Sequence, residues 1–204
     1  MGSREERPLT IGVALRRGRQ CPAICVVEAE RRPGKSGPVD HFLARHLERL
    51  PPRTTYVAIA ERAGEIAATT RERAGDNLLL YVDATGCGEP IVDLFREDPR
   101  IEDATACYFN HGDQRVFDGG RVQIGKAFLV ASLQAQLQAD RLHLPRTVES
   151  ERLAADLIEF EVKVDPNANH LTGAFPVGSR DELVTALGLA VAAAPPCFAT
   201  QLVY

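Results

Sequence analysis

The stretch that most constrains the fold is LLLYVD at residues 78–83, in which five apolar residues run straight into a carboxylate. A half-buried strand alternates apolar and polar residues, whereas an unbroken apolar run is typical of a central strand covered on both faces. Gly86 and Gly88 follow at once and allow the backbone to turn sharply. The run therefore predicts a buried strand at 78–83, in a sheet with helices on both sides.

Strand and helix patterns alternate along most of the remaining chain. Residues 41–50 fit either a helix or a strand, and we favour a strand that pairs with the one before it, because two prolines end the segment. The other expected strands are 9–15, 23–29, 106–109, 142–144 and 161–165, and the other expected helices are 90–96, 126–139 and 149–160. Three strands followed by alternating helices and strands predict a mixed α/β domain with helices on both faces of a central β-sheet.

Two further helices have recognisable starts. Thr54 or Thr55 is suited to cap a helix that runs to about Arg73. The last helix is expected to begin at Ser179, whose SRDE run matches a capping box. The apolar stripe of the first of these helices is Val57, Ala60, Ala63, Ile66 and Ala67.

Length and composition set limits on the class of protein. A chain of 204 residues predicts a single domain over 9–204, with 1–8 as a flexible N-terminus or a tag remnant. Five cysteines without a C-x-x-C pair indicate reduced thiols, as in a cytosolic protein. No apolar run approaches the roughly 18 residues of a membrane span. A net charge of −4 argues against a protein that binds nucleic acid through a positive charge spread over its whole surface.

Two acidic positions are candidates for chemistry. Asp83 stands at the carboxyl end of a strand, where ligands of α/β sheets bind, although it could simply cap the turn. Asp181 and Glu182 open the final helix, where the helix dipole alone favours acidic residues. These three residues would together supply carboxylate oxygens from separate elements, and such hard oxygen ligands are the ones that Mg²⁺ or Mn²⁺ sites use. A two-metal site of this kind can clamp the attacking and leaving oxygens of a phosphodiester.

A resemblance to a known family supports the metal-site interpretation. The runs YVDATGCGEPIVDLF, VQIGKAFLVASLQAQLQADRLHLP followed by LAADLIEFEVK, and SRDELVTALGLAVA resemble, in order, the nuclease domain of phage terminase large subunits. The resemblance extends from about Thr10 to Ala194. It implies an RNase H-like fold whose acids bind two divalent metals and cut double-stranded DNA during genome packaging.

Carried over position by position, the resemblance assigns metal ligation and catalysis to Asp83 and Asp181, with Glu182 as the acidic neighbour. Lys126, Arg16 and Arg17 are candidate contacts for DNA phosphates. The implied cofactor is Mg²⁺ or Mn²⁺, and the implied partners are double-stranded DNA and a packaging ATPase, portal or other packaging proteins. The implied location is the cytoplasm of a bacterial host cell, with no membrane partner.

One departure from the family pattern concerns the first strand. The family has an aspartate there that bridges both metals, but IGVALRRG places Ala14 at that position. Glu28 or Asp40 could substitute, although Glu28 is more simply an exposed strand end. Weakened metal binding is therefore expected. Two hypotheses stay open: a metal-dependent endonuclease, and a degenerate nuclease-like fold that serves as a DNA-binding or protein-interaction module.

Overall fold

The computed structural model describes residues 8–15, 21–35, 37–74, 77–110, 114–158, 161–165, 170–174 and 181–193. Its strands are β1 (Leu9–Ala14), β2 (Ala23–Arg32), β3 (Val39–Arg49), β4 (Leu78–Asp83), β5 (Thr105–Asn110), β6 (Arg115–Asp118), β7 (Arg121–Gly125), β8 (Leu142–His143), β9 (Glu161–Asp165) and β10 (His170–Ala174). Its helices are α1 (Tyr56–Ala74), α2 (Glu89–Arg96), α3 (Lys126–Gln138), α4 (Val148–Ile158) and α5 (Glu182–Gly188), which continues into a π-helical turn, η1 (Leu189–Ala193).

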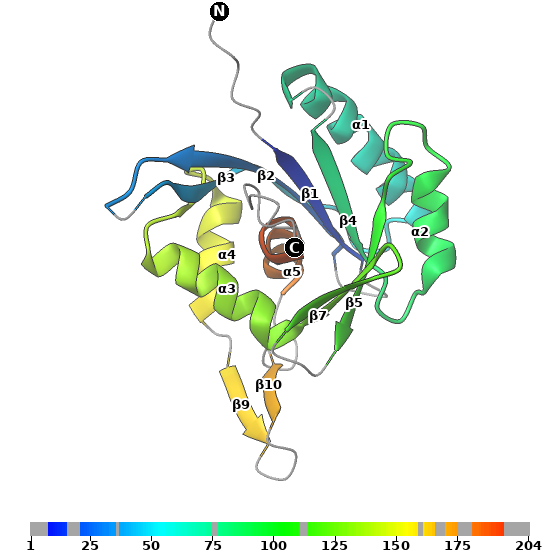
Figure 1. The fold of residues 1–204 in the computed structure, drawn as a ribbon. Coiled ribbons are helices and arrows are strands. Elements are labelled where there is room, and N and C mark those ends of the chain that lie inside the picture. The colour runs from blue at the N-terminus through cyan, green and yellow to red at the C-terminus, as the bar shows by residue number, and fades with distance from the viewer. Residues whose placement is uncertain are drawn as a thin grey trace, which may run out of the picture.

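Eight strands form one mixed sheet in the order β6-β7-β5-β4-β1-β2-β3-β8 (Figure 1). Three neighbouring pairs are parallel, namely β1 with β4, β4 with β5, and β5 with β7. Strand β2 is antiparallel to both β1 and β3. The pairing of β2 with β3 confirms that 41–50 is a strand. Strands β9 and β10 form a separate two-stranded sheet.

Helices cover both faces of the large sheet, as the unbroken apolar run of β4 predicts. In Figure 1, α1 and α2 lie on one side, and α3, α4 and α5 on the other. The side chains of β1 alternate between these two layers: Ile11 and Val13 pack with α1 and α2, and Ala14 packs with the α5 side. These observations confirm a mixed α/β fold with helices on both faces. No helix in the described residues is both long enough and apolar enough to cross a membrane.

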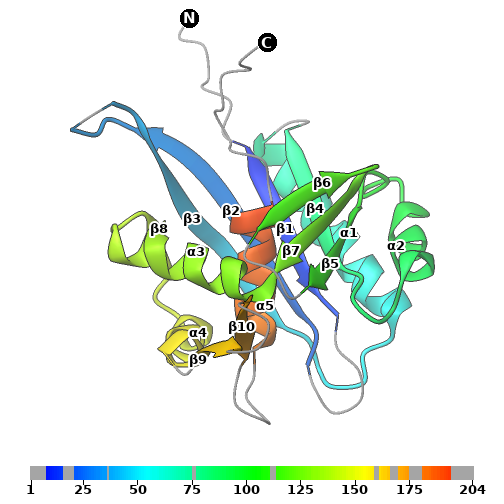
Figure 2. The same ribbon diagram turned by 60° about the horizontal axis from the view of Figure 1, so that its bottom comes forward.

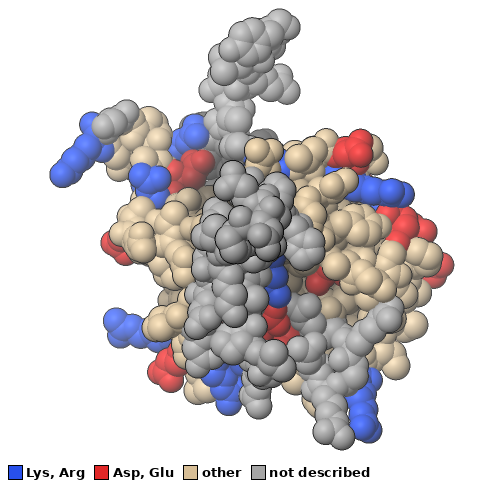
Figure 3. Space-filling view, turned by 90° about the horizontal axis from the view of Figure 1, so that it is seen from below, with Lys and Arg blue, Asp and Glu red and all other residues tan. Residues whose placement is uncertain are grey.

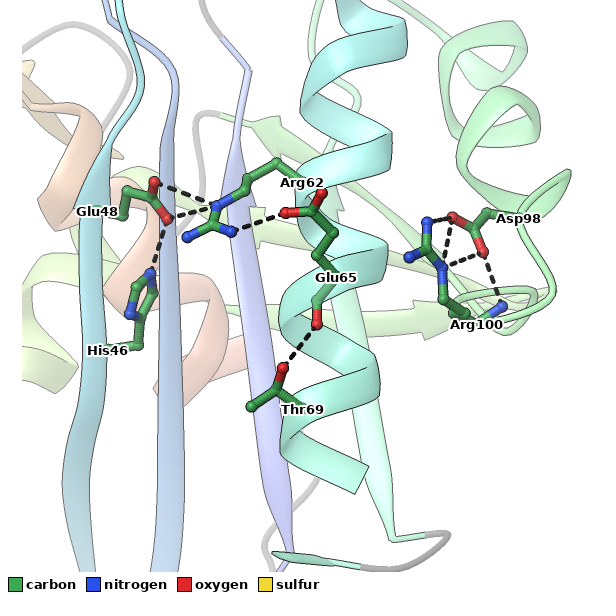
Figure 4. A network of polar contacts seen from close by, with 7 residues as sticks. All are labelled: His46, Glu48, Arg62, Glu65, Thr69, Asp98 and Arg100. Atoms are coloured by element: carbon green, nitrogen blue, oxygen red, sulfur yellow. Dashed lines mark hydrogen bonds and ion pairs between the residues drawn. The ribbon is translucent and has the colours of Figure 1, made fainter. Parts of the chain in front are cut away.

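A network of ion pairs ties α1 to the antiparallel side of the sheet (Figure 4). Arg62 of α1 donates to both carboxylate oxygens of Glu48 on β3, at 3.2 and 3.1 Å, and to Glu65 at 2.8 Å. His46 also contacts Glu48, at 2.8 Å between Nε2 and Oε2. Thr55 accepts a hydrogen bond from the Ala58 N–H at 3.2 Å, which confirms Thr55 as a cap of α1.

Three sequence expectations need correction. Strands β6 and β7 were not expected; their link is the turn at Gly119 and Gly120, both of which adopt positive φ angles. Val57 is 60% exposed and so does not belong to the buried stripe of α1. The final helix begins at Glu182 rather than at Ser179, which lies outside the described residues.

Candidate functional site

The carboxyl ends of β1 and β4 place Ala14 and Asp83 next to each other. The strands are parallel and Val13 pairs with Val82, so the following positions in register are Ala14 and Asp83. Ala14 and Tyr81 belong to the core on the α5 side, and Asp83, two residues after Tyr81, faces the same way. The position that the resemblance assigns to the missing acid therefore adjoins Asp83.

Asp83 is nearly inaccessible, with 2% of its surface exposed. The backbone N–H of Thr85 donates to Asp83 Oδ1 at 3.0 Å, so the carboxylate does cap the turn. Thr85 in turn accepts a hydrogen bond from the Phe109 N–H at 2.8 Å, which ties the turn to β5. Sequence reasoning missed Thr85, although an Asp followed two residues later by a backbone donor is typical of an Asx turn.

Two cysteines near Asp83 act as packing residues. Cys107 on β5 pairs with Asp83 in register. Burial, and then the negative charge of Asp83, raise the pKa of the Cys107 thiol well above its usual value, so Cys107 stays protonated. Cys87 lies in the turn after Asp83 and contacts the Tyr56 hydroxyl, at 3.3 Å between Sγ and Oη. Cys87 is thus half-buried in a contact with α1.

Two glycines remove side-chain bulk and let α5 pack closely: Gly12 lets it pack against β1, and Gly188 lets it pack against α3. A Cβ at Gly12 would overlap the Ala186 carbonyl oxygen, and a Cβ at Gly188 would overlap Leu129 of α3. Figure 2 shows α5 running opposite to β1, with its amino end near the carboxyl end of that strand. Ala14 lies two residues beyond Gly12 along β1, and Glu182 lies one turn before Ala186 along α5. Both steps are about 6 Å long and lead in the same direction.

The amino end of α5 carries two buried carboxylates. Asp181 is 6% exposed and Glu182 is 2% exposed. Asp181 occupies the N-cap position without a side-chain cap bond, and Glu182 is the first residue of the helix. Ser179, which opens the expected capping box, lies outside the described residues. Glu182 Oε2 is buried, and it has no hydrogen-bond partner among the described residues. An ionised carboxylate in that state is costly unless a cation balances it.

Lys126 meets Asp181 across 55 residues of sequence, at 2.6 Å between Nζ and Oδ2. Lys126 is the first residue of α3, where the helix dipole disfavours a positive charge. Its placement is explained by Asp181 rather than by its own helix. The structure thus joins Lys126 to one of the predicted acids, a pairing that the sequence analysis did not anticipate.

The first-strand position offers no carboxylate. Ala14 is fully buried among apolar neighbours. Glu28 pairs in register with Leu9, at the opposite end of β1, which is about 17 Å away along the strand. Glu28 binds Arg45, and Asp40 lies farther along the β2–β3 hairpin. The idea that Glu28 or Asp40 replaces the missing acid is therefore wrong.

The carboxylates at this site are the right type of ligand for a divalent cation, but too few of them lie together to hold one. Carboxylate oxygens are the ligands that Mg²⁺ and Mn²⁺ prefer. One of them, Glu182 Oε2, has no hydrogen-bond partner among the described residues. Within the described part of the chain, however, no group of three or more His, Cys, Asp or Glu side chains is arranged to hold a metal. Figure 3 shows acidic and basic atoms side by side near the centre of the molecule seen from below. Arg16 and Arg17 lie outside the described residues.

Among the solved structures that share this fold are viral terminase nuclease domains. The large terminase nuclease of thermophilic phage G20c matches with a TM-score of 0.56 and 15% identity, covering 92% of this chain and 82% of that one. The large terminase nuclease domain of bacteriophage SPP1 with bound Mn matches with a TM-score of 0.53 and 10% identity, covering 91% and 86%. The human cytomegalovirus terminase nuclease domain matches with a TM-score of 0.56 and 15% identity, covering 93% and 85%.

At the level of sequence, no family model matches this chain, and no curated protein matches it significantly. The likeness to the solved structures covers most of the chain and establishes the fold. The chain has the RNase H-like fold of large terminase nuclease domains.

Proposed function

We propose that this chain is a terminase-type nuclease domain that binds double-stranded DNA and hydrolyses it with Mg²⁺ or Mn²⁺, at a rate limited by weak metal binding. The observation that carries the proposal is Glu182 Oε2 at the amino end of α5, which is buried and has no hydrogen-bond partner among the described residues. Packing of α5 on β1 brings that end toward Asp83. The manganese in the SPP1 structure supports the choice of cation.

Each retained residue has a role in this proposal. Asp83 and Asp181 supply oxygen ligands, and Glu182 adds negative charge beside them. Thr85 holds the Asp83 carboxylate through its backbone N–H. Lys126, with Arg16 and Arg17 outside the described residues, would contact DNA phosphates. When bound, a divalent cation supplies a Lewis acid that polarises the phosphoryl group and activates water.

The proposal also extends to the setting. The domain would work in the cytoplasm of a bacterial host cell, beside a packaging ATPase, portal or other packaging proteins. The support for this setting is the ordered resemblance of the sequence and the phage origin of two of the matching structures.

A second candidate function is a nuclease-like module that binds DNA or protein without cutting. Two observations favour it. Ala14 fills the first-strand position and is fully buried, and the described residues contain no metal-binding group of three side chains. A site with fewer carboxylates should bind a second cation poorly.

Plasmid cleavage in Mn²⁺ separates the two candidates. We expect slow cleavage by the wild type, loss of cleavage in Asp83→Asn, and faster cleavage in Ala14→Asp. Asp118→Asn is the matched control, since Asp118 is exposed and pairs with the amino end of β7. Cleavage only after Ala14→Asp would favour the second candidate, and absence of cleavage in every variant would contradict the nuclease proposal.

A further inference from the structure

We propose that β6 is an interface strand through which two copies of this chain pair edge to edge and antiparallel, with Phe117 of one copy opposite Phe117 of the other. The two sheets would then continue into one another across a twofold axis. The pairing needs neither DNA nor a metal, so it goes beyond the proposed function. Its basis is a strand at the end of the sheet that carries two exposed apolar side chains.

The hydrogen-bond pattern of β6 determines which of its backbone groups point outward. Among the described strands, β6 lies at one end of the large sheet and pairs only with β7. The Gly125 N–H donates to the Gln114 carbonyl at 3.0 Å, so these two residues form a hydrogen-bonded pair. Such pairs alternate with non-hydrogen-bonded pairs along an antiparallel ladder, and Phe117 with Val122, three steps on, belongs to the second kind. The N–H and carbonyl of Phe117 therefore point away from β7, toward the outer edge.

Both faces of β6 carry an exposed apolar side chain. Val116 is 48% exposed and Phe117 is 52% exposed. Phe117 pairs with Val122, which packs on the α5 side, so Phe117 faces that side and Val116 faces the other. The Arg115 guanidinium lies over the Phe117 ring, 5.0 Å from its centroid, and restrains the ring. Edge strands are often protected by lysine, proline or a bulge, and β6 has none of these.

A second copy of the chain fits this edge because β6 can pair with itself. In an antiparallel pair centred on Phe117, the two Phe117 residues exchange both backbone hydrogen bonds, and their rings lie on the same face of the joined sheet. Cross-strand aromatic pairs of this kind stabilise sheets. Val116 of each copy lies opposite Asp118 of the other, so no like charges face each other directly. The interface is thus isologous, as in most homodimers.

The size of the edge sets the strength of the pairing. Stable protein interfaces bury about 1,200–2,000 Å². A strand of four residues offers much less, so we expect a weak dimer with a Kd of about 100 μM. The net charge of −4 on each copy opposes association, and salt screens this repulsion. The dimer should therefore tighten when the salt concentration rises, whereas an interface held by opposite charges would weaken.

Sedimentation velocity under reducing conditions, over a range of protein concentrations, tests the inference. For the wild type we expect the weight-average mass to rise from 22.3 kDa in dilute protein toward twice that value. Phe117→Lys places two like charges opposite each other and should weaken association at least about 10-fold. Phe117→Thr keeps a strand-forming residue without the ring and should also weaken association. Val57→Lys, at a 60% exposed site on α1, is the matched control and should dimerise like the wild type.

Hydrogen exchange locates the contact. The Phe117 amide points outward, so it should exchange more slowly in concentrated than in dilute protein, whereas the Val116 amide, which faces β7, should not change.

Three outcomes would overturn the inference. They are a mass of 22.3 kDa at every concentration, a dimer that is equally tight in the wild type and both Phe117 variants, and a Phe117 amide whose exchange does not depend on concentration. A cooperative thermal transition in each variant establishes that the proteins compared are folded.

Discussion

At the scale of single residues, the site is defined by what surrounds Asp83. Its carboxylate accepts from the Thr85 backbone, its neighbour across the strand pair is Ala14, and its neighbour on β5 is Cys107. These contacts explain why a carboxylate can end an apolar strand even without a metal. Asp83 is both a turn cap and a potential ligand, so the two interpretations of the sequence do not compete.

Thr85 should matter through its side chain, although it touches Asp83 only through its backbone. Thr85→Val removes the hydroxyl that accepts the Phe109 N–H and so loosens the turn that orients Asp83. We expect weaker Mn²⁺ binding and a loss of roughly 1 kcal/mol in the free energy of unfolding. Thr85→Ser keeps the acceptor and should behave like the wild type in calorimetry and urea denaturation. Equal Mn²⁺ affinity in Thr85→Val and Thr85→Ser would exclude this positioning role.

At the scale of elements, the contact between β1 and α5 places the site. Gly12 faces backbone atoms of Ala186 and Ala190, whereas Gly188 faces the terminal atoms of the Leu129 side chain. A backbone neighbour cannot move aside without shifting the helix, but a leucine side chain can change rotamer. The two glycines should therefore differ in their tolerance of added volume.

Gly12→Ala should destabilise the protein more than Gly188→Ala. Overpacking of a well-packed core costs about 1–3 kcal/mol, and we expect Gly12→Ala at or above the upper end of that range. Chemical denaturation of both variants measures the difference. Because α5 carries Asp181, Gly12→Ala should also weaken Mn²⁺ binding. A smaller loss in the free energy of unfolding for Gly12→Ala than for Gly188→Ala would contradict the close packing of α5 on β1.

A histidine pair links the short β8 to β3. His41 and His143 stack with ring centroids 5.2 Å apart, and their Nδ1 and Nε2 atoms are 2.9 Å apart. One ring must accept in this contact, so both cannot be protonated. Burial first, and then the positive charge of Arg32, lower the pKa of His41 below its usual 6.5. The folded protein therefore binds this proton less tightly than the unfolded chain.

The sign of the pH effect follows from that shift. The contribution of His41 to stability is complete above pH 6.5 and is lost as pH falls through the lowered pKa. We expect the urea midpoint of the wild type to fall between neutral pH and about pH 5, and His41→Gln to show a smaller fall. Identical pH profiles of the two proteins would show that the pair has no such role.

At the scale of the whole molecule, the sequence predicted the parts with strong local signals. The run at 78–83, the long helix after Lys126 and the strands 9–15 and 23–29 all appear, because periodicity and turn residues are local. The four-residue β6 was missed because its pattern is short, and it is mostly exposed. Val57 was misassigned because helical spacing does not say where the buried stripe ends.

Sequence reasoning proposed residues for the candidate site but not the contacts between them. Asp83, Asp181, Glu182 and Lys126 were singled out, but only the parallel register of β1 with β4 places Ala14 beside Asp83. The ion pair between Lys126 and Asp181 depends on how α3 and α5 pack, which no local pattern encodes. The same register excludes Glu28 as a replacement for the missing acid, because it pairs with the far end of β1.

The central proposal is that the chain binds a divalent metal only weakly, because Ala14 stands where the resemblance places a carboxylate. Calorimetric titration of Mn²⁺ into the wild type and into Ala14→Asp tests it most directly. We expect weak binding of a single cation by the wild type, and tighter or additional binding when an aspartate adjoins Asp83. Two tight Mn²⁺ sites in the wild type, or no gain in Ala14→Asp, would contradict it.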